Sequence, residues 1–203
     1  SNSKTLSLAI SDNPSSSTRM EVKLNEDLVT LNGAILDVPE NLGDPLYTAL
    51  NVDASGVNAS NIGIDIFGTP ENNTLTGSSQ NDTISGGTGF DDIDAGGGED
   101  IVEYSSTAKS IKGGSGYDIL KIIGNEDIVI DLSEAGASEN QIKILDQNNN
   151  MISATSANVS GFEDVDASQA SGSITVVGKN GINMNTFGGS SADNITTGDG
   201  NDI

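Results

Sequence analysis

The chain has 203 residues and a net charge of −22, from 30 acidic and 8 basic side chains. Such an acidic chain is a poor partner for nucleic acid or for an anionic membrane surface. It contains no cysteine and no histidine, which excludes disulfide bonds, thiolate chemistry, Ser–His–Asp triads and His-ligated zinc.

Residues 1–67 are predicted to form β-strands. Short runs of alternating or continuous apolar residues are separated by polar, proline-containing stretches at 12–18 and 39–45. Glycine-rich turns are missing here, so we expect a β segment that binds no metal. Residues 45–50 are compatible with one helical turn. The strands are expected at 5–10, 20–24, 28–31, 34–38, 49–57 and 62–67.

A nine-residue repeat is the strongest signal in the chain. Its eighth position is apolar in nine successive copies, although only 34% of the chain is hydrophobic, and its first, second and fourth positions are rich in glycine. An internal repeat of this kind, G-G-x-G-x-D-x-U-x, outweighs other sequence signals. The eighth position holds Val57, Ile66, Leu75, Ile84, Ile93, Val102, Ile111, Leu120 and Val129. The sixth position holds Asn73, Asp82, Asp91, Asp100, Lys109, Asp118 and Asp127.

The repeat predicts a stack of short parallel strands. Positions seven to nine form a strand whose apolar eighth residue points inward, and positions one to six form a turn in which glycine eases the backbone. Two repeats make one 18-residue coil, so the turns on one side lie about 4.8 Å apart. A cation midway between two turns would then be about 2.4 Å from each. Ca²⁺ prefers 2.3–2.6 Å with carboxylate and carbonyl oxygens, whereas Mg²⁺ prefers 2.0–2.1 Å, so the spacing predicts calcium.

On these residues the chain resembles the RTX (repeats-in-toxin) family of calcium-binding repeats. The resemblance is strongest over 68–121, and weaker copies occur at 188–196 and 197–203. It implies an all-β fold, a parallel β-solenoid or calcium-binding β-roll in which calcium and non-calcium segments alternate. It also implies that sixth-position Asp side chains and turn carbonyls bind Ca²⁺. A glycine-rich acidic linker without metal is disfavoured, because a linker need not keep the apolar position.

The resemblance gives a set of candidate calcium-binding residues, carried over from the matching turn positions. We expect about three or more ions within 68–121. Because low hydrophobicity with high net charge is typical of disorder, we expect the chain to be disordered without Ca²⁺ and folded with it. The candidates are Asn73, Gly77, Ser79, Asp82, Gly86, Gly87, Thr88, Gly89, Asp91, Gly96, Gly97, Gly98, Asp100, Gly113, Gly114, Gly116, Asp118, Asp193 and Asp202.

The 18-residue coil also predicts which turns share an ion. Pairs Asp82/Asp100 and Asp100/Asp118 should make two sites on one side, and Asn73/Asp91 one weaker site on the other. Asp193 and Asp202 fall on opposite sides and should not share an ion.

The repeat at 104–112 departs from this pattern. It has Lys109 in place of Asp and no glycine, so we expect no calcium there. Instead, the Lys109 ammonium should lie near Asp91 or Asp127.

Residues 122–187 look like a second copy of the first segment. Similar stretches recur at a spacing of about 110 residues, which suggests two copies of one unit. We therefore divide the chain into a non-calcium β segment at 1–67, a calcium-binding β-roll at 68–130, a second non-calcium β segment at 131–187 and the truncated start of a second calcium block at 188–203. The acidic group at 163–166 (EDVD) is interpreted as a solvated loop. We expect the chain to be a fragment of a longer repetitive protein.

Catalysis finds no support in the sequence, which has neither a G-x-S-x-G motif nor a P-loop. The favoured function is a structural, calcium-stabilised segment of a large secreted bacterial cell-surface protein, S-layer-like or adhesin. The expected partners are calcium, neighbouring repeats or lattice subunits, and cell-surface polysaccharide; insertion into a membrane is not expected. Two alternatives stay open: the calcium-binding accessory or secretion domain of a type I secreted enzyme or toxin, and a module that binds glycans or ice along a flat strand face.

Overall fold

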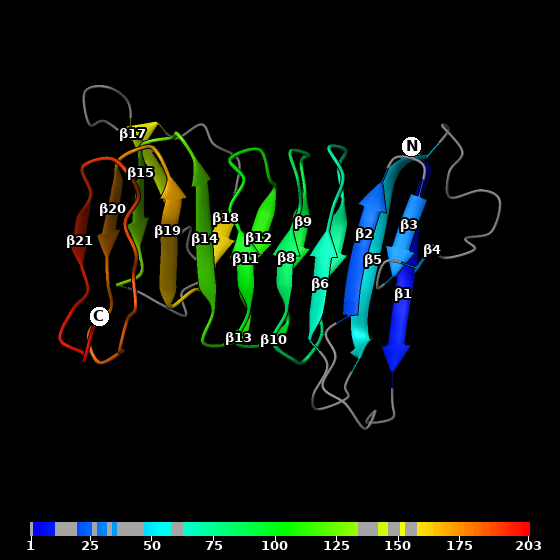
Figure 1. The fold of residues 1–203 in the computed structure, drawn as a ribbon, viewed down its shortest axis with the longest axis horizontal. Helices are drawn as coiled ribbons and strands as arrows, with labels where there is room; N and C mark the ends of the chain where they lie inside the picture. Colours follow the sequence, from blue (N-terminus) through cyan, green and yellow to red (C-terminus); the bar gives the residue numbers. More distant parts are fainter. Residues whose placement is uncertain are drawn as a thin grey trace.

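The computed structural model is an all-β structure without a helix in the part of the chain that it describes. It describes residues 51–57, 63–133, 142 and 158–203 with their side chains. At 2–10, 20–25, 28–31, 34–35, 47–50, 143–145 and 151–152 it describes the strand backbone alone. The strands stand side by side along the long axis of the molecule (Figure 1).

The centre of the molecule is a two-sided parallel roll, as the nine-residue repeat predicts. Strands on each side pair with the strand 18 residues further along the chain, for example Ile66 with Ile84 and Leu75 with Ile93. One sheet contains β6 (Ile64–Phe67), β8 (Thr83–Ser85), β11 (Ile101–Glu103) and β14 (Ile119–Gly124). The other contains β5 (Tyr47–Val57), β7 (Thr74–Thr76), β9 (Asp92–Asp94) and β12 (Ser110–Lys112).

The core of the roll consists of the eighth-position side chains stacked in two columns. The residues of both columns are at most 1% exposed, which confirms the predicted inward face. Removing apolar area from water in this way stabilises the fold by about 25 cal/mol per Å². One column is Ile66, Ile84, Val102 and Leu120, and the other is Leu75, Ile93 and Ile111.

The predicted register fails at both ends of this series. In β5 the residue opposite Leu75 is Val52 rather than Val57, although Val57 is also buried. In β15 (Ile128–Asp131) the buried residues are Ile128 and Ile130, and Val129 is only half-buried. Both strands adjoin segments that do not repeat every nine residues, and a shift of one residue turns every side chain of a strand to the other face.

Outside the roll, the first segment adds strands to both sheets. β1 (Asn2–Ile10) pairs in parallel with β5. β2 (Met20–Asn25) pairs in parallel with β6 and carries the antiparallel strands β3 (Leu28–Leu31) and β4 (Ala34–Ile35). The helical turn considered at 45–50 does not form where the structure describes the chain, because β5 begins at Tyr47.

The second half repeats this pairing about 110 residues later. β15 carries the antiparallel strands β16 (Ile142–Leu145) and β17 (Met151–Ile152), as β2 carries β3 and β4. β20 (Ile174–Val177) pairs with β15 as β6 pairs with β2, and β21 (Asn194–Thr196) pairs with β20 as β8 pairs with β6.

The chain leaves the roll after β14 and returns to it at β18 (Asn158–Ser160). β18 pairs with β12, placing Val159 opposite Ile111. β19 (Asp164–Ala170) pairs with β14, placing Val165 opposite Leu120. One further coil, built from residues far along the chain, therefore stacks on the end of the roll.

Candidate metal centre

Glycine allows the turns of the roll to stack in close contact. On one side, the turns at 77–82, 95–100 and 113–118 follow one another, and β10 (Gly97–Gly98) pairs directly with β13 (Ser115–Gly116). A Cβ atom on Gly116, whose φ is 138°, would collide with the Gly98 carbonyl oxygen. Backbone oxygens of one turn are thereby brought against the next turn.

The sixth-position carboxylates lie inside this stack. Asp82, Asp91, Asp100 and Asp118 are at most 1% exposed. The Oδ1 atom of each accepts a hydrogen bond of 2.7–2.9 Å from the backbone N–H of the residue 18 positions earlier. The donors are Ile64, Asn73, Asp82 and Asp100, so the carboxylates form a ladder between successive coils.

The second carboxylate oxygen differs between two kinds of turn. Where the second position is Ser78, its N–H donates to Asp82 Oδ2 at 2.6 Å and its hydroxyl donates to Oδ1 at 3.0 Å. Where the second position is Gly87 or Gly114, the backbone has a positive φ of 87° or 117°. In those turns the Oδ2 atoms of Asp91 and Asp118 are buried without a hydrogen-bond partner.

These two aspartates are electrostatically unusual. Burial raises the pKa of Asp91 to about 6, against the lowering effect of the hydrogen bond from Asn73. Burial also raises the pKa of Asp118 to about 6, opposed by the bond from Asp100 and assisted by the nearby carboxylates of Glu163 and Glu99. A buried carboxylate oxygen without a partner is costly unless a cation or a proton neutralises it.

The donor set fits calcium. Hard cations such as Ca²⁺ take carboxylate and backbone carbonyl oxygens together, which are the groups that the stacked turns present. In the parts of the chain that the structure describes, no three acidic side chains are placed to hold one metal ion by themselves. A cation at these turns therefore has to draw on backbone oxygens as well as on Asp91 or Asp118.

First-position glycines make room for the carboxylates. A Cβ atom on Gly77, Gly86 or Gly113 would lie 2.6–2.8 Å from Oδ2 of the aspartate five residues later. The Gly188 position stands in the same relation to Asp193, at 2.6 Å. A side chain at these positions would occupy the space beside the carboxylate.

The remaining candidates lie in the same stacked turns. Ser79 and Thr88 are exposed at the third position of their turns. Gly89 and Gly96 adjoin the Glu71 and Ser78 carbonyl oxygens, with which an added Cβ would collide.

The two C-terminal candidates continue the same hydrogen-bonding pattern at half-buried positions. Asp193 accepts the Ile174 N–H and Asp202 accepts the Met184 N–H, each at 2.9 Å.

The acidic group at 163–166 is not a solvated loop, as the sequence had suggested, but part of the stacked structure. The Glu163 carboxylate accepts the Asp118 N–H at 3.0 Å, in the place that a sixth-position aspartate takes elsewhere. Asp164 is 1% exposed and accepts hydrogen bonds from the Tyr117 hydroxyl, the Thr186 hydroxyl and the Asn185 N–H. No nine-residue pattern includes these residues, so the repeat gave no signal for them.

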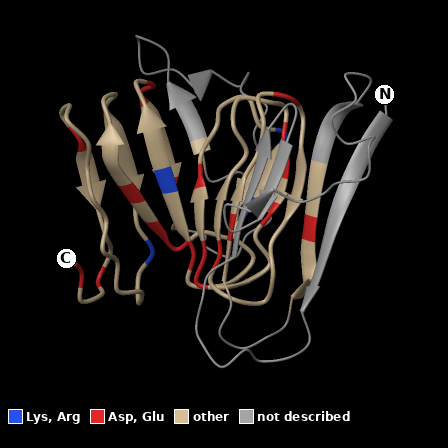
Figure 2. Ribbon diagram, turned by 45° about the vertical axis from the view of Figure 1, so that its right-hand side comes forward, with Lys and Arg blue, Asp and Glu red and all other residues tan. Residues whose placement is uncertain are grey.

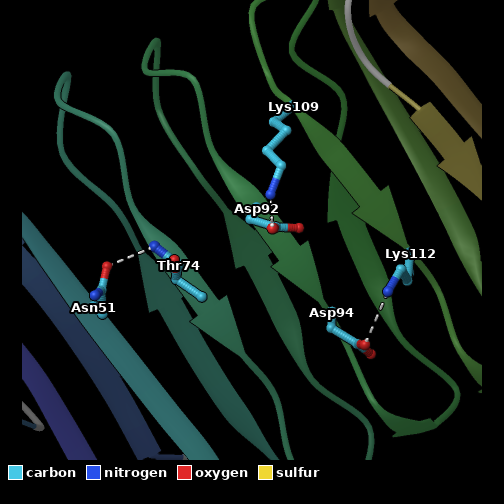
Figure 3. A network of polar contacts seen from close by, with 6 residues as sticks. All are labelled: Asn51, Thr74, Asp92, Asp94, Lys109 and Lys112. Atoms are coloured by element: carbon cyan, nitrogen blue, oxygen red, sulfur yellow. Dashed lines mark hydrogen bonds and ion pairs between the residues drawn. The ribbon is translucent and has the colours of Figure 1, made fainter.

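The turn at 104–109 stacks as the eighth-position residue Ile111 predicts, but its lysine binds a different carboxylate. Lys109 Nζ lies 2.6 Å from Asp92 Oδ2 on the outer face of the sheet, rather than beside Asp91 or Asp127 (Figure 3). Lys112 and Asp94 form a second, looser pair at 3.7 Å on the same face. Both pairs are about half exposed, so they belong to the surface rather than to the carboxylate ladder.

Acidic residues outnumber basic ones in the described part of the chain. Figure 2 shows many red segments and few blue ones, with several red segments in the turns at the lower edge of the roll. In the described residues, no helix has the length and apolar character that crossing a membrane requires.

The comparison with protein-family models agrees with this geometry. Residues 67–102 and 187–203 match the RTX calcium-binding nonapeptide repeat, in 4 copies. Neither a curated protein nor a solved structure matches the chain significantly. The matched segments contain the turns at 77–82, 86–91 and 95–100, with Asp82, Asp91 and Asp100. The chain is therefore identified as a carrier of RTX calcium-binding nonapeptide repeats, folded as a parallel β-roll.

Proposed function

We propose that the chain is a structural segment of a large secreted bacterial cell-surface protein, of the S-layer or adhesin kind, and that it folds on binding Ca²⁺. The observation that carries this proposal is the pair of buried oxygens, Asp91 Oδ2 and Asp118 Oδ2, that have no hydrogen-bond partner. Leaving such oxygens unsatisfied costs about 1–3 kcal/mol or more each, so the fold favours a bound cation beside them. The proposed role is structural and includes no catalytic step.

The hydrogen bonds of the aspartates indicate which turns should bind calcium most tightly. Both oxygens of Asp82 accept hydrogen bonds from Ser78, whereas Asp91 and Asp118 each have one oxygen available for a cation. We therefore place one principal ion beside Asp91 Oδ2 and one beside Asp118 Oδ2. Bound Ca²⁺ would supply the positive charge that these buried carboxylates lack.

Native mass spectrometry with isothermal titration calorimetry tests the calcium sites. The intact chain should bind about three or more ions, and Asp91→Asn should lose one of them, because an amide keeps the hydrogen bond from Asn73 but loses the charge. Asp92→Asn is the matched control, since Asp92 is half-buried on the outer face and pairs with Lys109. Equal ion counts in Asp91→Asn and the wild-type chain would count against the site.

The cellular role needs a separate experiment. Antibodies raised against the chain should label intact, unpermeabilised cells of the source bacterium, and calcium chelation should release or loosen the labelled layer. Recovery of the antigen only from the culture medium, attached to a catalytic domain, would instead favour the accessory domain of a secreted enzyme or toxin.

A further inference from the structure

The end of the roll carries one more turn that is built like the calcium turns but lies outside the nonapeptide repeat. This turn comprises residues 161–163, between β18 and β19, and it stacks on the turn at 113–118. Gly113 N–H donates to the Ser160 carbonyl at 3.0 Å, and Glu163 N–H donates to the Asp118 carbonyl at 3.0 Å. The two turns are thus hydrogen-bonded along both edges, although 45 residues separate Asp118 from Glu163 in sequence.

The two ends of this short turn take the places of two functional positions of the repeat. Within the roll, a Cβ atom added to the first-position glycine Gly77 would lie between Asp82 Oδ2 and the carbonyl oxygen of Ala95, the first residue of the next turn. At the end of the roll, a Cβ atom added to Gly113 would lie between Asp118 Oδ2 and the Gly161 carbonyl oxygen. Gly161 therefore stands where the next first-position residue would be.

Glu163 stands where the next sixth-position aspartate would be. In the roll, Asp82 N–H donates to Asp100 Oδ1 at 2.7 Å and Asp100 N–H donates to Asp118 Oδ1 at 2.9 Å. At the end, Asp118 N–H donates to Glu163 Oε2 at 3.0 Å. The glutamate side chain is one methylene longer than aspartate and reaches the same N–H from a turn that is three residues shorter.

We propose that Glu163 and the Gly161 carbonyl complete the calcium-binding site at Asp118, which joins the second half of the chain to the roll. Asp118 Oδ2 is the second observation that points to a ligand here, because it is fully buried, has no hydrogen-bond partner and faces the Gly161 carbonyl across the Gly113 position. A Cβ on Gly113 would be 2.8 Å from Asp118 Oδ2 and would collide with the Gly161 oxygen. The two oxygens therefore lie within roughly 5 Å of each other, which is the greatest separation at which they can share one Ca²⁺.

The charge at this place agrees with a cation. The Glu163 and Asp118 carboxylates are close enough to interact, and Glu99 adds a third negative charge nearby. The proximity of two carboxylates in a partly buried place is unfavourable without a positive charge between them. Lys109 and Lys112 are paired with Asp92 and Asp94.

Other polar contacts hold the junction beside the proposed site. Beside Asp118, the Tyr117 hydroxyl donates to Asp164 Oδ2 at 3.0 Å and lies 2.7 Å from the Asn183 carbonyl oxygen. These bonds fix β19 and the segment near residue 183 on the turn at 113–118. A cation bound to Asp118 and Glu163 would make this junction depend on calcium, as the repeats within the roll do.

Glu163→Gln tests the site in the intact chain. The amide oxygen of glutamine still accepts the Asp118 N–H, so the turn should keep its hydrogen bond while losing the charge that a cation needs. Native mass spectrometry should count one Ca²⁺ fewer than in the wild-type chain, and calorimetry should show the other sites unchanged. The control Glu103→Gln removes the same charge from the half-buried strand position opposite Lys121 and should leave the ion count unchanged.

Hydrogen exchange locates the lost ion. Calcium should slow amide exchange at 158–170 in the wild-type chain, and this effect should disappear in Glu163→Gln while protection at 83–103 remains. An unchanged ion count in Glu163→Gln overturns the proposal, and so does the simultaneous loss of every ion, because the residue would then act on folding alone. The inference rests on the proposed calcium binding, but the two fail differently: a wild-type chain that binds no Ca²⁺ at all would contradict the proposed function itself.

Discussion

Asp91 and Asp118 differ from Asp82 in one oxygen atom, Oδ2, which accepts a hydrogen bond in Asp82 but has no partner in the other two. The difference accompanies the second residue of the turn, which is glycine before Asp91 and Asp118 and serine before Asp82. The Ser78 N–H donates to Asp82 Oδ2 and its hydroxyl donates to Oδ1, whereas Gly87 and Gly114 have a positive φ and leave Oδ2 without a hydrogen bond. We infer that a turn with serine at this position binds a cation less tightly, but is more stable when no cation is bound.

The raised pKa values of Asp91 and Asp118 predict how the metal-free chain responds to pH. The folded pKa of about 6 lies above the usual value near 3.9, so the folded state holds these two protons more tightly than the unfolded chain does. This contribution to the free energy of unfolding is fully present below about pH 4 and is lost as pH rises through about 6. In chelator, the β-sheet signal in circular dichroism should therefore increase as pH falls from 7 to about 4.5.

Two double variants separate this effect from the general loss of negative charge in acid. Asp91→Asn/Asp118→Asn should flatten the pH dependence between about 4 and 6, because the groups that bind the extra protons are gone. Asp127→Asn/Asp199→Asn removes two exposed carboxylates and should leave the slope in place. The opposite ranking of the two variants would show that the buried pair does not control the response. With calcium present, affinity should fall below about pH 6, since protons and Ca²⁺ compete for the same oxygens.

Lys109 is predicted to contribute little, in spite of its position in the carboxylate series. Its pair with Asp92 is exposed, so Lys109→Ala should lower the free energy of unfolding in saturating calcium by no more than about 1 kcal/mol. Urea denaturation measures this, with Lys112→Ala as the matched control because it breaks the looser pair on the same face. A change in the number of bound ions in Lys109→Ala would mean that the turn at 104–109 takes part in calcium binding.

At the level of the elements, the close stacking of the turns restricts the sequence more than the short strands do. Strands of three residues have few ladder bonds each, so the roll depends on both the apolar columns and the contacts between turns. In the stack of β10 on β13, Gly116 faces the carbonyl of Gly98. Glycine at this position is required by space as well as by backbone conformation.

Gly116→Ala and Gly124→Ala separate these two requirements. Both glycines have positive φ, of 138° and 98°, so alanine should strain either position by about 1–3 kcal/mol. A Cβ at Gly116 would also collide with the Gly98 oxygen, whereas nothing lies within 4 Å of a Cβ at Gly124. Thermal unfolding in calcium should show a clearly larger loss of stability for Gly116→Ala. Equal losses would indicate that the turns separate easily and that their stacking adds little.

For the whole molecule, the carboxylate ladder predicts folding that depends on calcium. Four buried aspartates sit in neighbouring coils of a chain whose net charge is −22, so repulsion opposes the folded state until cations or protons neutralise them. A ligand that binds only the folded state stabilises it by mass action. Circular dichroism should show mostly coil in chelator at neutral pH and β-sheet in millimolar Ca²⁺.

Magnesium at the same concentration is the matched control for ionic strength and charge. It should restore much less β-sheet, because Mg²⁺ requires shorter distances and releases its water reluctantly. A β spectrum that persists after calcium removal would contradict calcium-dependent folding of the roll.

The sequence by itself determined the parts of this protein that repeat locally. The nine-residue spacing predicted the strands at positions seven to nine, the buried column from Ile66 to Leu120 and the turns that hold Asp82, Asp91, Asp100 and Asp118. These features could be read from the chain because each coil repeats the same local conformation and stacks on a neighbour at a fixed separation of 18 residues.

Only the tertiary structure decided the features where this regular stacking ends. The opposition of Val52 to Leu75, the outward turn of Val129 and the use of Glu163 in place of an aspartate all depend on strands that meet across irregular connections. Lys109 pairs with Asp92 because both side chains lie on the same outer face of the sheet. No local period encodes such contacts, because the length and path of the intervening chain set which residues meet.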